Sequence, residues 1–271
     1  MSTLSPMNPI STPHAALSFP PPGAGVPAHY RGIWRRTLLE TSAGRDTATV
    51  VYWLQGTSWH ADIRIPAGRP DFAGIAGLAA CPAAHRAWLA TQQGFAGVTS
   101  VRRDAYGELC SWRRVVDYQP PQDQPDEGWM RFEPDCLIET GAHAGYLEHW
   151  LPVPDTTARI AVLRAVDGAA GTDVPAEMLF LAGPYAMHLR WPRRAPAAAG
   201  PWLDLEIAFA VRQAAGLDIV HSTLPWMEGT TRPLRVLAHD GRFAELDCDG
   251  RARTWRILES TGADVWDVEG T

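Results

Sequence analysis

Short segments in which apolar and polar residues alternate recur along most of this chain. In segment 59–65 four apolar residues alternate with His60, Asp62 and Arg64, and segment 203–212 has the same two-residue period despite its alanines. A period of two is typical of a β-strand with one buried face, and it does not fit a helix. The segments are separated by turn residues such as Gly56 and Pro120, so the pattern favours an antiparallel sheet.

The segments predict strands over nearly all of the chain. In the first half they lie at residues 32–41, 49–55, 59–65, 97–102, 108–118, 129–133, 136–140 and 146–151. In the second half they lie at 158–166, 177–182, 185–191, 203–212, 217–223, 234–239, 242–247 and 253–258. One alanine-rich helix is predicted at residues 82–93, ended by Gly94. We therefore predict an all-β fold, either one antiparallel lipocalin-like barrel or two barrel-like lobes.

The distribution of proline divides the chain into three parts. Residues 1–29 are rich in Pro, Ser, Thr and Ala and are predicted to form a flexible tail. Pro152 and Pro154 mark a seam where the strand pattern begins again. The predicted domains are a first β lobe at residues 30–152 and a second β lobe at residues 153–271.

Charge and composition exclude several classes of function. The net charge is -6, from 30 acidic and 24 basic residues, so no basic excess would attract nucleic acid or an anionic membrane surface. All the basic residues are arginine, which excludes Schiff-base chemistry, pyridoxal phosphate attachment and a P-loop lysine. Glycine-rich nucleotide motifs and the G-x-S-x-G nucleophile elbow are also missing. We therefore expect no cofactor.

Cysteine and histidine spacing gives no sign of a metal site. The four cysteines are far apart and form no C-x-x-C pair, so we expect reduced thiols and no disulfide framework. The nine histidines lack the spacing of metal ligands, and no metal is predicted. No apolar run reaches the roughly 18 residues that cross a bilayer, and the N-terminus does not resemble a signal peptide. A cytoplasmic protein without nucleic-acid or membrane partners is expected, and its oligomeric state is left open.

The best local indication of a site is the predicted hairpin of residues 136–151. If His143 and Ala144 form its turn, Glu139 lies opposite Glu148 on one face, where two like charges repel. Two carboxylates in a partly dry site push one pKa upward and place an acid beside a base. The alternative is a pair of surface carboxylates, each paired with an arginine, and a register slip by one residue would separate them.

Other candidate residues lie on neighbouring predicted strands. His60 could act as a general base and Arg64 could bind a substrate carboxylate, although their strand face could equally be an ordinary polar exterior. Trp112 and Arg113 lie on opposite faces, so at most one of them can share the cavity. Tyr146 and Trp150 share a face with Glu148 and are the predicted pocket wall. Most of the other tryptophans are expected to fill the core.

Two functional hypotheses follow from these residues. The first is a cofactor-independent enzyme of the lyase, hydratase or isomerase type, acting on a small aromatic or otherwise unsaturated carboxylate in a Trp-lined cavity. Its catalytic residues would be Glu139, Glu148 and His60, and its substrate-binding residues Arg64, Arg113, Tyr146, Trp150 and Trp112. The second is a lipocalin-like protein that binds a small ligand or a protein partner without turnover. An enzyme needs an ionisable group with a perturbed pKa inside the cavity, and a binding protein does not.

Four sequence segments resemble a known family. They are D-C-L-I-E-T-G at residues 135–141, Y-L-E-H-W-L-P-V-P-D at 146–155, G-F-A-G-V-T-S-V at 94–101 and T-W-R-I-L-E at 254–259. The chain is similar in these segments to the fungal casein-kinase-interacting protein family and its bacterial relatives. The resemblance implies a two-lobed, lipocalin-like β fold and specifies no catalytic residues. The fungal members are associated with a kinase, a partner that no residue of this sequence supports.

Overall fold

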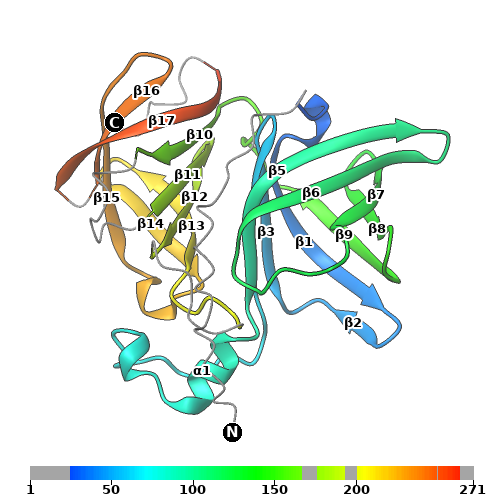
Figure 1. The fold of residues 1–271 in the computed structure, drawn as a ribbon, viewed down its shortest axis with the longest axis horizontal. Coiled ribbons are helices and arrows are strands. Elements are labelled where there is room, and N and C mark those ends of the chain that lie inside the picture. Colours follow the sequence, from blue (N-terminus) through cyan, green and yellow to red (C-terminus); the bar gives the residue numbers. More distant parts are fainter. Residues whose placement is uncertain (1–24, 167–175, 193–199, 249, 263–271) are drawn as a thin grey trace, which may run out of the picture.

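The computed structural model describes residues 25–166, 176–192, 200–248 and 250–262, and it contains two closed antiparallel β-barrels. The barrels lie side by side, the first on the right and the second on the left in Figure 1. The predicted all-β fold with two barrel-like lobes is confirmed.

The first barrel is an up-and-down barrel in which each strand pairs with the next and β9 pairs with β1. Its strands are β1 (Gly32–Thr41), β3 (Val50–Gln55), β4 (Trp59–Ile65), β5 (Gln93–Asp104), β6 (Gly107–Asp117), β7 (Glu127–Phe132), β8 (Leu137–Gly141) and β9 (Tyr146–Pro152). A short additional strand, β2 (Gly44–Asp46), extends the end of β1. The sequence pattern predicted every barrel strand and missed only β2 in this lobe.

The second barrel closes in the same way, through pairing of its last strand with its first. Its strands are β10 (Ile160–Ala165), β11 (Ala176–Ala182), β12 (Tyr185–Trp191), β13 (Glu206–Gln213), β14 (Gly216–Ser222), β15 (Thr231–His239), β16 (Phe243–Cys248) and β17 (Arg251–Thr261). The first barrel thus ends at Pro152, and the second begins at Ile160.

The two barrels share one large apolar core, built from the outward faces of their strands. On β4 Trp59 and Ile63 point away from their own barrel and pack against residues of the second barrel such as Phe180 and Ile207. The seam also contains a polar contact, because the Glu259 carboxylate accepts hydrogen bonds from the backbone N–H groups at residues 57, 58 and 59, at 2.6–2.9 Å. Since the outward face of β4 is covered by a second barrel, its other face must line the interior of the first.

The helix is shorter than its composition predicts. Helix α1 spans Ala83–Leu89, and short 3₁₀ helices lie at Ala28–Tyr30, Leu78–Ala80 and Pro225–Met227. Gly94 does not end the helix but lies in β5, where a Cβ would be 2.8 Å from the carbonyl oxygen of Asp62 on β4. Glycine is used here because two strands approach closely, a reason that local sequence does not reveal.

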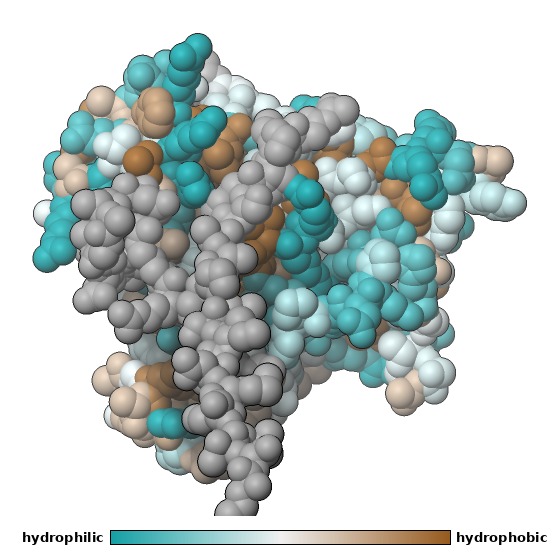
Figure 2. Space-filling model, in the orientation of Figure 1, coloured by the Kyte–Doolittle hydropathy of each residue, from teal (hydrophilic) through white to brown (hydrophobic). Residues whose placement is uncertain are grey.

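The predicted tail is only partly described. Residues 1–24 lie outside the described residues. Residues 25–29 pack onto the first barrel, where Val26 is buried and its N–H donates to the carbonyl oxygen of Thr57 at 2.6 Å. In the described parts of the chain, no helix has both the length and the apolar character needed to cross a membrane. Hydrophilic residues are spread over the first barrel on the right of Figure 2.

Candidate functional site

Polar side chains of β4 point into the first barrel. Asp62 is buried, and its carboxylate accepts two hydrogen bonds from Arg64, at 2.9 Å to Nε and 3.3 Å to Nη2. An alternating strand that is covered on its apolar face places its polar face inside the barrel. The alternative of an ordinary polar exterior is therefore wrong for this strand.

The hairpin of β8 and β9 has the predicted register, with Glu139 directly opposite Glu148. Both side chains point into the barrel and are almost fully buried, with exposed fractions of 4% and 3%. The alternative of two surface carboxylates is thus wrong. The expected repulsion is relieved in a different way on each strand.

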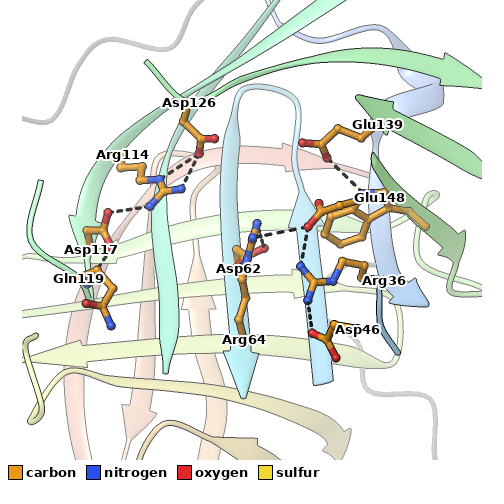
Figure 3. Close-up of polar contacts among 11 residues, drawn as sticks. Arg36, Asp46, Asp62, Arg64, Arg114, Asp117, Gln119, Asp126, Glu139 and Glu148 are labelled. Carbon is orange, nitrogen blue, oxygen red and sulfur yellow. Dashed lines mark hydrogen bonds and ion pairs between the residues drawn. The ribbon is translucent and has the colours of Figure 1, made fainter. Parts of the chain in front are cut away.

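Glu148 is held by arginine. Its Oε1 lies 2.5 Å from Nη1 of Arg36 and 3.9 Å from Nη1 of Arg64. Arg36 comes from β1, the strand that closes the barrel against β9, and its other nitrogen Nη2 binds Asp46 at 3.2 Å. Figure 3 shows Arg36 between the two carboxylates. Sequence reasoning missed Arg36, although its alternation with the inward Trp34 could have indicated it.

Glu139 has no arginine partner among the described residues. Its Oε1 accepts a hydrogen bond from the Tyr146 hydroxyl at 2.7 Å, and its Oε2 accepts one from Nε1 of Trp150 at 3.1 Å. Burial raises the pKa of Glu139 to about 8, and the charge of Glu148 acts in the same direction. Gly128 on β7 makes room for this side chain, because a Cβ there would lie 2.8 Å from Cγ of Glu139. These surroundings favour the protonated, uncharged form of Glu139.

These groups surround a cavity of about 290 Å³. Its aromatic lining residues are Trp53, Phe95, Trp112, Tyr146 and Trp150. Its charged lining residues are Asp62, Asp126, Glu139, Glu148, Arg64 and Arg114. Tyr146 and Trp150 line the cavity, in agreement with the strand face that they share with Glu148. The other tryptophans on predicted strands include Trp59 and Trp191, which pack in the core between the barrels.

Strand β6 contributes Trp112 and Arg114 to the cavity, and Arg113 points outward. Arg113 thus does not line this cavity, but it lines an adjoining cavity of about 780 Å³ that shares Trp112 and Arg114 with it, so its predicted role in substrate binding stays a prediction. Arg114 donates to Asp126 at 2.7 Å and to Asp117 at 3.0 Å, and its guanidinium stacks 3.7 Å from the ring centre of Phe95. The inward position of Arg114 could have been read from its alternation with Trp112.

A β-bulge ends this alternation one residue beyond Arg114. The pairing of β5 with β6 shifts between Ala96 and Gly97, so that Val116 faces outward into the core between the barrels. A Cβ at Gly97 would collide with the backbone of Arg113, so the close approach at the bulge requires glycine. The bulge shifts the alternation by one residue, so that Asp117, opposite the cavity-lining Phe95, shares the face of Arg114.

His60 lies inside the barrel but does not line the cavity. Its ring is fully buried, and Nδ1 is 2.9 Å from the hydroxyl of Thr99, which in turn donates to Gln55 at 2.7 Å. Burial and the charge of Arg114 lower the pKa of His60 to about 3. The geometry therefore does not support the predicted role of His60 as a general base.

A second buried polar cluster lies inside the second barrel. Glu177 accepts hydrogen bonds from Nε2 of His188 at 3.0 Å and from Arg253 at 2.5 Å, and Arg232 binds Glu206 at 2.6 Å. Burial alone would raise the pKa of Glu177, but the hydrogen bond from His188 and the nearby guanidinium groups lower it to about 2. Sequence reasoning singled out none of these residues, because the arginines that join the neighbouring Glu177 and His188 come from positions 44 and 76 residues away.

Within the described ranges, no three His, Cys, Asp or Glu side chains are grouped so that they could hold a metal ion. All four cysteines are free thiols, as expected. Aromatic and charged side chains alternate around the cavity wall.

Comparisons of this chain with protein-family models, with curated proteins and with solved structures give no match. The resemblance to the casein-kinase-interacting family therefore stays a prediction. The fold defines the molecule as a double β-barrel protein with a polar, Trp-lined cavity in its first barrel.

Proposed function

We propose that the first barrel is a cofactor-independent enzyme of the lyase, hydratase or isomerase type, acting on a small aromatic or otherwise unsaturated molecule. The observation that carries this proposal is the pair of buried glutamates facing one cavity, of which only Glu148 has arginine partners. Two carboxyl groups in such different surroundings differ in their tendency to hold a proton. This difference is what a paired acid and base require.

The roles follow from the contacts of each group. Glu139, uncharged at neutral pH, donates a proton to one position of the substrate, and Glu148 accepts a proton from another position, so that the proton count balances. Tyr146 and Trp150 fix the carboxyl of Glu139, since each donates a hydrogen bond to one of its oxygens. Trp53 and Trp112 supply the apolar walls against which a flat molecule would stack.

The substrate need not be a carboxylate, contrary to the sequence-based expectation. Arg64 and Arg114 are the only basic side chains that line the cavity among the described residues, and both are already bound to carboxylates. An anionic substrate would have to compete with Asp62 and Asp126 for them. The cavity therefore gives no support to an anionic substrate.

A binding protein without turnover is the second candidate. It is favoured by one specific observation: both oxygens of Glu139 already accept hydrogen bonds, which is also the arrangement of a carboxyl group that only shapes a pocket. A functional assay separates the two candidates.

Deuterium incorporation from solvent tests the enzymatic proposal. The wild-type protein is incubated in D₂O with a panel of small aromatic and unsaturated alcohols, amides, amines and acids, and exchange is followed by NMR. We expect at least one compound to incorporate deuterium, and Glu139→Gln to slow that exchange by about 100-fold or more, the usual contribution of a general acid.

The matched control is Glu245→Gln, which removes an exposed carboxylate of the second barrel and should leave the rate unchanged. Glu148→Gln is less suitable, because it leaves Arg36 with a single carboxylate partner. Compounds that bind without exchange, or exchange that is equally fast in Glu139→Gln, would replace the enzymatic proposal with the binding protein.

A further inference from the structure

The cavity of the first barrel contains more carboxyl groups than it has positive charge to balance them. Four acidic and two basic side chains line it: Asp62, Asp126, Glu139 and Glu148 against Arg64 and Arg114. Behind this layer Arg36 is matched by Asp46, and Asp117 adds a further carboxylate on Arg114. With Glu139 uncharged, an excess of negative charge remains. An electrostatically complementary ligand is therefore positive.

The guanidinium groups are already occupied, whereas some carboxylate oxygens are not. Arg64 holds both oxygens of Asp62, and Arg114 bridges Asp117 and Asp126. Oε2 of Glu148 and Oδ1 of Asp126 accept no hydrogen bond from any described residue. These two open oxygens are acceptors, and a hydrogen-bond donor on a ligand would fit them.

The walls of the same cavity suit a cation. Trp53, Trp112 and Trp150 come from β3, β6 and β9 and surround the acidic groups, and aromatic faces attract positive charge. The protein already uses this interaction, since the guanidinium groups of Arg114 and Arg64 lie 3.7 and 5.4 Å from the ring centre of Phe95. A protonated amine carried on an aromatic ring would use both the walls and the open oxygens.

One buried N–H group of a cavity-lining residue is also open to a ligand. Nε1 of Trp53, a residue that is 2% exposed and lines the cavity, has no hydrogen-bond partner among the described residues. A buried donor without an acceptor is costly, and such groups are rare in folded proteins. An oxygen atom on the ligand would satisfy it.

From the charge balance, the open carboxylate oxygens, the aromatic walls and the unpaired indole N–H, we infer that the first barrel binds a small aromatic amine in its protonated form. The ligand also carries a hydroxyl or carbonyl oxygen. The inference rests on the site of the proposed function and names its ligand class, but it concerns binding and does not require turnover.

Three probes of one shape test the inference. Tyramine, tyrosol and para-hydroxyphenylpropanoate share a hydroxyphenyl ring and differ in whether the other end is an ammonium, a neutral hydroxyl or a carboxylate. Binding to the full chain is measured by calorimetry and by quenching of tryptophan fluorescence at neutral pH. We expect tyramine to bind at least about tenfold more tightly than tyrosol, and the carboxylate to bind most weakly.

The variant Asp126→Asn removes one open carboxylate at a half-buried position, and Glu245→Gln is the control on the outside of the second barrel. Asp126→Asn should weaken tyramine about tenfold and leave tyrosol unchanged, and the control should affect neither. Tighter binding of tyrosol or of the carboxylate, equal weakening of both probes, or no binding of tyramine would each overturn the inference.

The outcomes for binding and for turnover are separate. Selective binding of tyramine to wild type and to Glu139→Gln, with no deuterium exchange for any compound, would refute the enzymatic proposal and leave the ligand class standing. If a neutral compound exchanges deuterium in a way that depends on Glu139, and the amine is not preferred, the enzymatic proposal would stand and the ligand class would be refuted.

Discussion

The two barrels have the same strand order and closure, but their interiors differ. The first barrel surrounds its carboxylates with tryptophan and leaves a cavity, whereas the second fills its interior with small and aliphatic residues such as Ala161, Leu163 and Ala210. In the second barrel Glu177 has three cationic or donor partners, and in the first barrel Glu139 is hydrogen-bonded only to the uncharged Tyr146 and Trp150 among the described residues. One fold thus carries a compensated ion network in one lobe and an uncompensated acid in the other.

Equivalent strands of the two barrels both carry a pair of inward polar residues. On β4 the inward pair is Asp62 and Arg64, and on β12 it is His188 and Arg190. In the first barrel the pair faces a cavity, and in the second it faces Glu177. The comparison teaches that an inward charged pair does not itself make a site, because a site also requires space and an unmatched group.

The largest expected effect is a loss of stability when the buried charge of Glu177 in the second barrel is removed. Glu177→Gln leaves Arg253, Arg190 and His188 around a neutral amide, and we expect the free energy of unfolding to fall by roughly 3–5 kcal/mol. The shape-matched Glu139→Gln in the first barrel should instead raise it by roughly 2–3 kcal/mol at neutral pH, because wild-type Glu139 must take up a proton on folding and the amide need not. Urea unfolding measures both, and equal losses would contradict the contrast.

The contribution of Glu177 to stability should depend on pH. Glu177 has a pKa lowered from 4.5 to about 2 by folding, so its stabilisation is present above pH 4.5 and is lost as the pH falls toward 2. The difference in stability between wild type and Glu177→Gln should therefore shrink with acidification over that range. A constant difference would mean that the charge of Glu177 is not what stabilises the network.

An intermediate effect of opposite sign is expected in the first barrel. Folding raises the pKa of Glu139 from 4.5 to about 8, so the native state holds more protons than the unfolded chain between these values. Stability therefore decreases as pH rises through this window, by on the order of 1 kcal/mol per pH unit. Glu139→Gln should flatten this slope in urea titrations at several pH values. An unchanged slope would mean that other groups cause this pH dependence of stability.

The smallest expected effect is the difference between replacing the inward Arg114 and replacing the outward Arg113. Arg114→Ala removes the contacts with Asp117 and Asp126 and the stacking on Phe95, and should cost about 1–2 kcal/mol of unfolding free energy and alter ligand binding. Arg113→Ala removes an outward side chain and should stay within about 0.5 kcal/mol with unchanged binding. Thermal unfolding and the tyramine titration check both, and a larger effect at Arg113 would contradict the assigned faces.

Much of the fold could be predicted from the sequence because strand alternation is a local property. The boundaries of β1, β4 and β12 follow from it directly. The pairing of Glu139 with Glu148 could also be predicted, since a short hairpin fixes its own register. The extent of the helix was wrong because Gly94 serves a contact between strands and does not end the helix.

The remaining parts of the site depend on contacts between distant segments. Arg36 and Glu148 are 112 residues apart and meet only because β1 closes the barrel against β9. The choice between interior and exterior for His60, Asp62 and Arg64 was open, because alternation defines two faces of a strand without saying which one is inside.

The strands, the hairpin register and the absence of lysine chemistry follow from residue identity and near neighbours, and could be inferred without coordinates. That Glu139 lacks an arginine partner among the described residues and Glu177 has two became visible in the closed barrel, because burial and charge compensation depend on how distant strands meet. The physical reason is that a carboxyl group's proton affinity is set by every group around it, and barrel closure brings those groups from the whole lobe.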